Sequence, residues 1–118
     1  MERTPAGKLD WSPGSAETFT GNVWSSPLSR GPDRTVNAIG VMFAPGARSY
    51  WHSHPDGQVL YVATGAGRVG SADGTVSEMA AGDVIYTPAG ERHWHGAKAD
   101  SIMGHITITL VGSEAKWG

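Results

Sequence analysis

The chain contains no cysteine, no surplus of basic residues and no long apolar run. The absence of cysteine excludes disulfides, cysteine-ligated zinc, iron–sulfur clusters and cysteine nucleophiles, and makes the cytoplasm the default compartment. Nine Lys and Arg against eleven Asp and Glu give a net charge of −2, which argues against nucleic acid and a membrane surface as partners. No segment approaches the roughly 20 apolar residues of a membrane span, and the first residues lack a secretory signal pattern.

Long segments free of glycine and proline are also missing. The 118 residues include 17 Gly and 7 Pro, and the longest stretch without either runs from Ala47 to His54. An average helix needs about 11 to 12 residues, whereas a strand needs about 5 to 6. The sequence therefore predicts an all-β fold, a sandwich or barrel of short strands joined by frequent turns.

The length fits one domain. We expect residues 1–17 to form a lead-in, residues 18–111 the barrel and residues 112–118 a short tail. Turns are expected between the strands, among them Gly65–Gly67 and a loop over Ser25–Asp33. The expected strands are Thr18–Trp24, Thr35–Phe43, Arg48–His54, Gln58–Thr64, Arg68–Val69, Thr75–Met79, Val84–Thr87, Arg92–His95 and Ser101–Val111.

All five histidines lie between positions 52 and 105, and four of them form two His-x-His pairs. Side chains alternate faces along a strand, so His52 and His54 point to one side, and so do His93 and His95. A lone histidine is usually a surface residue or a satisfied core group. Two such pairs, with His105 on a third strand, instead predict a metal site, because imidazole is the commonest metal ligand.

The spacing of these residues resembles the two sequence motifs of the cupin superfamily. The first motif is matched by Gly46, His52, His54, Gln58 and Gly65, and the second by Gly82, Pro88, Gly90 and His93. Two positions depart from the family pattern: Gln58 stands where Glu is usual, and Ala97 where Asn is usual. The resemblance implies that residues 1–118 form a single cupin domain, a small β-barrel or jelly roll.

The resemblance also implies that His52, His54, Gln58 and His93 bind a divalent metal. Gln58 is the least secure of these ligands, because a neutral amide is a weaker ligand than a carboxylate; the alternative is that it hydrogen-bonds a metal-bound water. Three imidazoles and an amide leave the ion its full +2 charge, which favours Lewis-acid chemistry on an oxygen. The same charge disfavours oxidation of the metal, so Gln58 argues against oxygen activation.

Two histidines remain after the ligands are assigned. His95 follows His93 by two residues and should face the same interior, while His105 shares one face of Ser101–Val111 with Thr107 and Thr109. We interpret His95 and His105 as a general acid/base pair working near neutral pH. The alternative for His105 is a polar residue on the outer face of a surface strand.

The segments HSHPDGQ and PAGERHWHG, together with the late-strand His105, resemble small single-domain cupins that are metal-dependent hydroxynitrile lyases. This resemblance implies manganese, with iron, zinc or nickel as alternatives, and cleavage of a cyanohydrin to an aldehyde and cyanide. An Fe(II) dioxygenase or other oxidoreductase is the main rival, and a non-catalytic binding module is the third interpretation. Small cupins usually dimerise by sheet extension, so we expect a homodimer that exchanges Thr18–Trp24.

Overall fold

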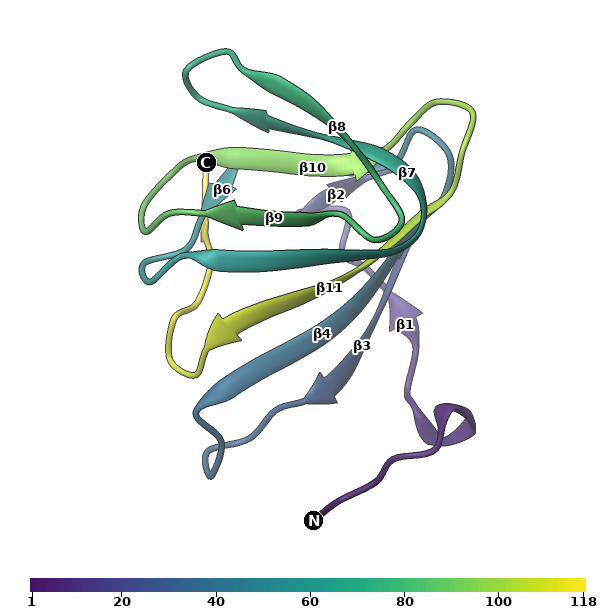
Figure 1. Ribbon diagram of the computed structural model, residues 1–118, viewed down its shortest axis with the longest axis vertical. Coiled ribbons are helices and arrows are strands. Elements are labelled where there is room, and N and C mark those ends of the chain that lie inside the picture. The colour runs from purple at the N-terminus through teal and green to yellow at the C-terminus, as the bar shows by residue number, and fades with distance from the viewer.

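The structure is a computed structural model that describes residues 1–118, and nearly all of its regular structure is β-strand (Figure 1). The exception is one turn of 3-10 helix, Ala6–Lys8. The strands are β1 Ser12–Pro13, β2 Phe19–Thr20, β3 Val23–Ser29, β4 Val36–Phe43, β5 Arg48–Ser49, β6 His52–Ser53, β7 Gln58–Ser71, β8 Val76–Ala80, β9 Val84–Thr87, β10 His93–Ala97, β11 Met103–Leu110 and β12 Lys116–Trp117. The predicted all-β fold is confirmed, and the helical turn is too short and polar to cross a membrane.

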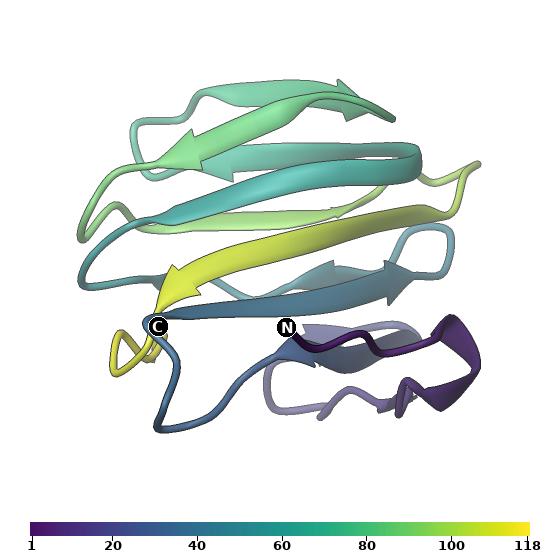
Figure 2. The ribbon, with the colours of Figure 1, turned by 60° about the horizontal axis from the view of Figure 1, so that its bottom comes forward.

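All strand pairs are antiparallel, and the sheet curls on itself in the manner of a jelly roll (Figures 1 and 2). We call the wall formed by β3, β4, β11, β9 and the first half of β7 the front sheet. The opposite wall, the back sheet, consists of the second half of β7 with β8, β10, β5, β6, β12 and β2. The interior between these walls holds the histidines.

Strand β7 belongs to both sheets. Its first half pairs with β11 and β9, and its second half, from Ala66 onward, pairs with β8 and β10. The change of sheet occurs near Gly65, whose φ of +74° suits glycine and where an added Cβ would collide with the carbonyl of Ile102. The turn expected at Gly65–Gly67 was therefore wrong: glycine bends the strand there without ending its hydrogen-bonded ladder.

The expected strand Thr18–Trp24 is also divided between two elements. Gly21, with a φ of +76°, separates β2, which pairs with β5, from β3, which pairs with β4. Strand β3 then continues through Ser29, so that the expected loop begins later than the sequence indicated. Both ends of the chain contribute short strands: β1 pairs with β3, and β12 pairs with β6.

The faces of the front sheet carry an unusual distribution of side chains. On β11, His105 and Thr107 are buried in the interior, whereas Ile108 and Leu110 are exposed on the outside. Sheets with one solvated face normally place apolar residues inward and polar residues outward. The interior is still partly apolar, because a cluster of buried side chains that includes Phe43, Val62 and Met103 fills the end of the barrel beyond His105.

Candidate functional site

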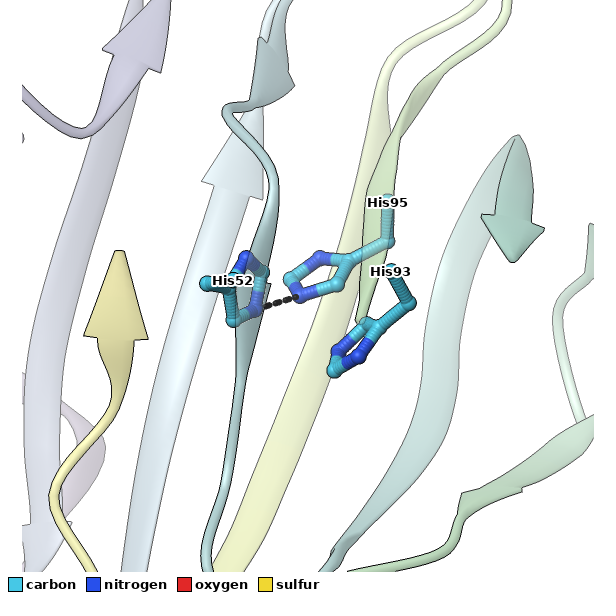
Figure 3. A group of neighbouring side chains, drawn as sticks. All are labelled: His52, His93 and His95. Atoms are coloured by element: carbon cyan, nitrogen blue, oxygen red, sulfur yellow. Dashed lines mark hydrogen bonds between the residues drawn. The ribbon is translucent and has the colours of Figure 1, made fainter. Parts of the chain in front are cut away.

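Four strands and one short connection bring the five histidines and Gln58 together between the two sheets. His52 lies on β6, His93 and His95 on β10, His105 on β11, and Gln58 begins β7. His54 lies in the short connection between β6 and β7. All six side chains are buried. Figure 3 shows the rings of His52, His93 and His95 converging from β6 and β10, whose residues His52 and His93 are direct cross-strand partners.

The ring nitrogens form one contiguous group. Nitrogens of His52, His93 and His95 lie within 4.8 Å of one another. The ring of His54 lies slightly farther out, with its centroid 5.3 Å from that of His52 and 5.9 Å from that of His93. Gln58 Oε1 is 3.1 Å from His93 Nε2. The structure thus gathers the four expected ligands, but its tightest nitrogen group contains His95, which we expected to carry protons.

Backbone carbonyls orient two of the rings. His52 Nδ1 is 2.8 Å from the carbonyl oxygen of Tyr50, and His93 Nδ1 is 2.9 Å from that of Glu91. Because a carbonyl only accepts, each Nδ1 carries the proton, and in the neutral ring Nε2 bears a free lone pair that points into the cluster. Such a hydrogen bond on the far side of the ring is the usual way in which a metal-binding histidine is oriented.

The histidines are held neutral. Burial is the largest cause in every case, and it lowers the pKa of His52, His54 and His105 to about 4. Burial likewise lowers the pKa of His93. The pKa of His95 falls well below its usual value because burial is reinforced by the neighbouring histidines. Neutral imidazole is the form that binds metal and accepts protons.

These fixed protons determine the direction of a hydrogen-bonded chain of rings. His52 Nε2 has a free lone pair, so His95 Nε2, 3.3 Å away, must donate to it. His95 Nδ1 is then a bare acceptor, and His105 Nε2 donates to it across 3.0 Å. The chain ends at His105 Nδ1, which is buried without a partner.

The remaining atoms fit a bound cation. Both ring nitrogens of His54 are buried without any hydrogen-bond partner. His93 Nε2 and Gln58 Oε1 face one another as two acceptors, a contact that a cation between them would satisfy. Rotating the amide of Gln58 by half a turn would instead let its NH₂ donate to His93. These two arrangements correspond to the two roles that the sequence left open for Gln58.

A cavity of about 670 Å³ opens onto the cluster. It reaches His52, His54, Gln58 and His95, whereas His93 and His105 do not line it. His105 therefore contacts the cavity only through His95. The face of β11 that the sequence placed with His105 is indeed the inner one, since Thr107 and Thr109 line the cavity.

Several cavity residues were missed by sequence reasoning. Residues 111–115 and Trp117 line the cavity, although we expected residues 112–118 to be only a tail. The ring of Trp117 lies 4.6 Å from that of His52, because β12 pairs with β6. Asn37 and Ile39 also line the cavity from β4. The alternation of residues 35–43 could have indicated these two, but no local pattern marks the end of the chain.

Comparisons with known proteins relate the chain to cupins. The model of the cupin domain family matches residues 40–113. An (R)-mandelonitrile lyase from Granulicella tundricola is 41% identical over 120 residues, which cover 99% of this chain and 92% of that protein. The crystal structure of a cupin-like protein from Thermotoga maritima is 38% identical with a TM-score of 0.87, over 91% of this chain and 84% of that one. A polyketide cyclase from Streptomyces resistomycificus, 20% identical with a TM-score of 0.77 over 93% of this chain and 79% of that one, shares the fold.

Proposed function

Because the chain belongs to the cupin family, we propose that it is a manganese-dependent lyase that cleaves and forms the carbon–carbon bond of cyanohydrins. The observation that carries this proposal is the cluster of neutral, buried histidines at the end of a small-molecule cavity. The mandelonitrile lyase named above supports the choice of reaction, because it is similar over nearly the whole chain.

We assign His52, His54, Gln58 and His93 as the metal ligands. His54 has two unpartnered ring nitrogens, and His93 and Gln58 meet as two acceptors. His95, in contrast, already has a partner at each ring nitrogen. A divalent ion at this position supplies Lewis-acid polarisation of an oxygen atom, and the neutral Gln58 leaves its charge undiminished.

His95 is the group that moves the proton. When a bound cation takes the lone pair of His52, His95 no longer has to donate to it, and His95 and His105 can adopt the opposite tautomers. In these, His95 Nδ1 donates to His105 Nε2, and His95 Nε2 carries a free lone pair toward the cavity. His95 Nε2 then accepts the hydroxyl proton of the cyanohydrin as the C=O bond forms and the bond to cyanide breaks, its electron pair leaving with cyanide. Because the pKa of His95 is lowered, the proton passes on to the cyanide, giving an aldehyde and hydrogen cyanide.

The cavity suits an aromatic cyanohydrin. Its volume of about 670 Å³ lies within the range of about 300–1,000 Å³ that is typical of small-molecule sites. Phe19, Ile39 and Val41 supply an apolar wall for a ring, while Thr107 offers a hydroxyl beside it. His105 acts through His95 and is therefore a positioning residue in this scheme.

The test uses the full chain loaded with Mn²⁺ and supplied with racemic mandelonitrile, with benzaldehyde release followed by ultraviolet absorbance. We expect turnover in the native protein and loss of both metal and activity in His52→Ala. His95→Ala should keep its metal and lose activity by about 10²- to 10⁴-fold, the usual contribution of general acid–base catalysis.

Other outcomes would contradict the proposal. Turnover that is unchanged in His95→Ala would remove the assigned base. A native protein that holds metal but releases no benzaldehyde would favour a binding module. Oxygen consumption by the iron-loaded protein with an aromatic or β-dicarbonyl substrate would instead favour a dioxygenase.

A further inference from the structure

Charged side chains are rare around the cavity. Among the residues that line it, Arg30 is the only Lys or Arg, and Glu114 is the only Asp or Glu. Both are exposed and therefore lie at the cavity mouth. Arg34, in the same connection between β3 and β4, is bound to Glu2 and to the hydroxyl of Ser29. Arg30, in contrast, forms no ion pair within the chain, so the cavity has one uncommitted cation.

Two half-buried polar side chains lie beside Arg30. Asn37 on β4 and Thr109 on β11 are direct cross-strand partners, and both line the cavity. Arg30 follows Ser29, whose partner is Ala38, so Arg30 leaves β3 level with Asn37. Neither the Asn37 amide nor the Thr109 hydroxyl makes a hydrogen bond within the chain. Polar groups that are partly removed from water normally have partners, so these donors are free to bind a ligand. We call Arg30, Asn37 and Thr109 the polar end of the cavity.

The sheet register gives the distance between the polar end and the assigned metal ligands. On β7, Val59 follows Gln58 and is the partner of Ile108 on β11. Gln58, Thr109 and Asn37 therefore lie in one row across β7, β11 and β4. Two strand spacings of about 4.8 Å, or roughly 10 Å, separate the first of these residues from the last. An elongated substrate with its reacting carbon at the metal would thus reach the polar end with its opposite end.

We propose that the polar end binds a carboxylate that the substrate carries remote from its reacting carbon. The inference rests on the proposed function and narrows its substrate to an aromatic hydroxynitrile, or the corresponding aldehyde, with a carboxylate on the ring. The planar guanidinium of Arg30 offers paired donors that match the two oxygens of a carboxylate. The Asn37 amide and the Thr109 hydroxyl can each add one hydrogen bond. Because Arg30 is exposed, the carboxylate stays partly in water, and its desolvation costs little.

Glu114 is the opposing charge at the cavity mouth. It lies in the connection between β11 and β12 and forms no ion pair with Arg30. The register places the uncommitted amide and hydroxyl beside Arg30, which favours an anionic over a cationic substrate group. Glu114 repels such an anion through space. Removal of either charge should therefore change the affinity for a carboxylate, in opposite directions.

The experiment measures the binding of two unreactive alcohols to the full, Mn²⁺-loaded chain by calorimetry. Benzyl alcohol and 4-carboxybenzyl alcohol differ only in the carboxylate. We expect the carboxylated alcohol to bind at least about tenfold more tightly, because hydrogen bonds to a charged group are the stronger kind. Arg30→Gln should remove most of this preference, and Arg30→Lys should keep only part of it, since an ammonium lacks the paired donors. Glu114→Gln should increase the preference.

Arg68→Gln is the matched control, because it makes the same change in net charge on the part of β7 that belongs to the back sheet, outside the cavity. This variant should keep the native preference, and circular dichroism with bound metal should verify that every variant is folded. The proposal would be overturned if the native chain fails to bind the carboxylated alcohol, binds both alcohols equally, or keeps its preference in Arg30→Gln. Because neither alcohol is turned over, the comparison stands apart from the lyase assay: a preference for the carboxylate in a chain that cleaves no hydroxynitrile would support the polar end and contradict only the proposed reaction.

Discussion

Five chemically identical side chains acquire different roles in this site because their ring nitrogens meet different neighbours. His52 and His93 present lone pairs, since backbone carbonyls hold their other nitrogens protonated. His95 lies between two further rings and makes a hydrogen bond at each of its ring nitrogens. Neither ring nitrogen of His54 has a hydrogen-bond partner. In the proposed function, these different surroundings of the ring nitrogens, rather than the residue type, separate the metal ligands from the proton carrier.

This distinction predicts that only one of two alanine substitutions in the cluster lowers the metal content. His54→Ala should lower the affinity for Mn²⁺ by more than about tenfold, because removal of a hydrogen-bonded partner to a ligand alone already costs 10- to 100-fold. His95→Ala should leave close to one equivalent bound. Elemental analysis after dialysis against a series of free-metal concentrations would measure both. The reverse result would place the metal in the tight group formed by His52, His93 and His95.

The sequence predicted the residues of the site better than it predicted their pairing. The alternation along strands placed His52 with His54, and His93 with His95, on one side each, and the resemblance to cupins placed the two pairs together. The tautomers depend on the carbonyls of Tyr50 and Glu91, and nothing in a sequence pattern reveals the direction of a single carbonyl. The contact between His95 and His105 likewise depends on packing between strands that are distant in the chain.

At the scale of elements, one long strand joins the two walls of the barrel. Because β7 contributes to both sheets, its bend lets Gln58 at its start face the histidines on β10. Sequence reasoning treated Gly65 as a turn, since glycine with neighbouring glycine is a turn signal. Hydrogen bonding to partners on both sides of the bend kept the strand continuous, and such long-range pairing is absent from the local sequence.

Substitution of Gly65 by alanine should therefore destabilise the whole barrel. The residue needs a positive φ, and an added Cβ would also meet the carbonyl of Ile102. A strained backbone alone costs about 1–3 kcal/mol, so we expect a larger loss in the free energy of unfolding measured with urea. Gly74→Ala is the control, because Gly74 has a φ of +91° with nothing near its added Cβ. Equal losses in the two variants would contradict a steric role for Gly65.

For the whole molecule, the histidine cluster makes folding sensitive to acid. In the folded chain the pKa of His52, His54 and His105 is about 4, against 6.5 for an ordinary histidine. Between these values the unfolded chain binds more protons than the folded one, so stability falls as pH falls from about 6.5 toward about 4. Above about pH 6.5 the histidines are neutral in both states, and their contribution to the free energy of unfolding is fully present.

We expect the metal-free protein, kept in chelator, to unfold at a lower urea concentration at pH 5.0 than at pH 7.5. Each buried histidine changes the free energy of unfolding by at most about 1.4 kcal/mol per pH unit. His105→Gln, which removes one titrating ring, should show a shallower dependence than the native chain. A urea midpoint that is the same at both pH values would mean that these rings become protonated without opening the fold.

The spacing of glycine and proline was enough to predict the fold class. It did not predict that the ends of the chain add strands to the sheets and side chains to the cavity. Trp117 reaches His52 because β12 pairs with β6, a contact between residues far apart in sequence. The alternation on β11 was recognised correctly, and its two faces could be separated by residue type. The structure shows that the polar face is the inner one, as the role given to His105 required, since Thr107 and Thr109 line the cavity.

The alternation along β4 and β11 gives this scaffold two surfaces that can be varied separately. Asn37, Ile39, Thr107 and Thr109 project into the cavity, while their immediate neighbours along the strands project outward. A combinatorial library restricted to these four positions would alter the shape of the chamber and leave the exterior of the molecule unchanged.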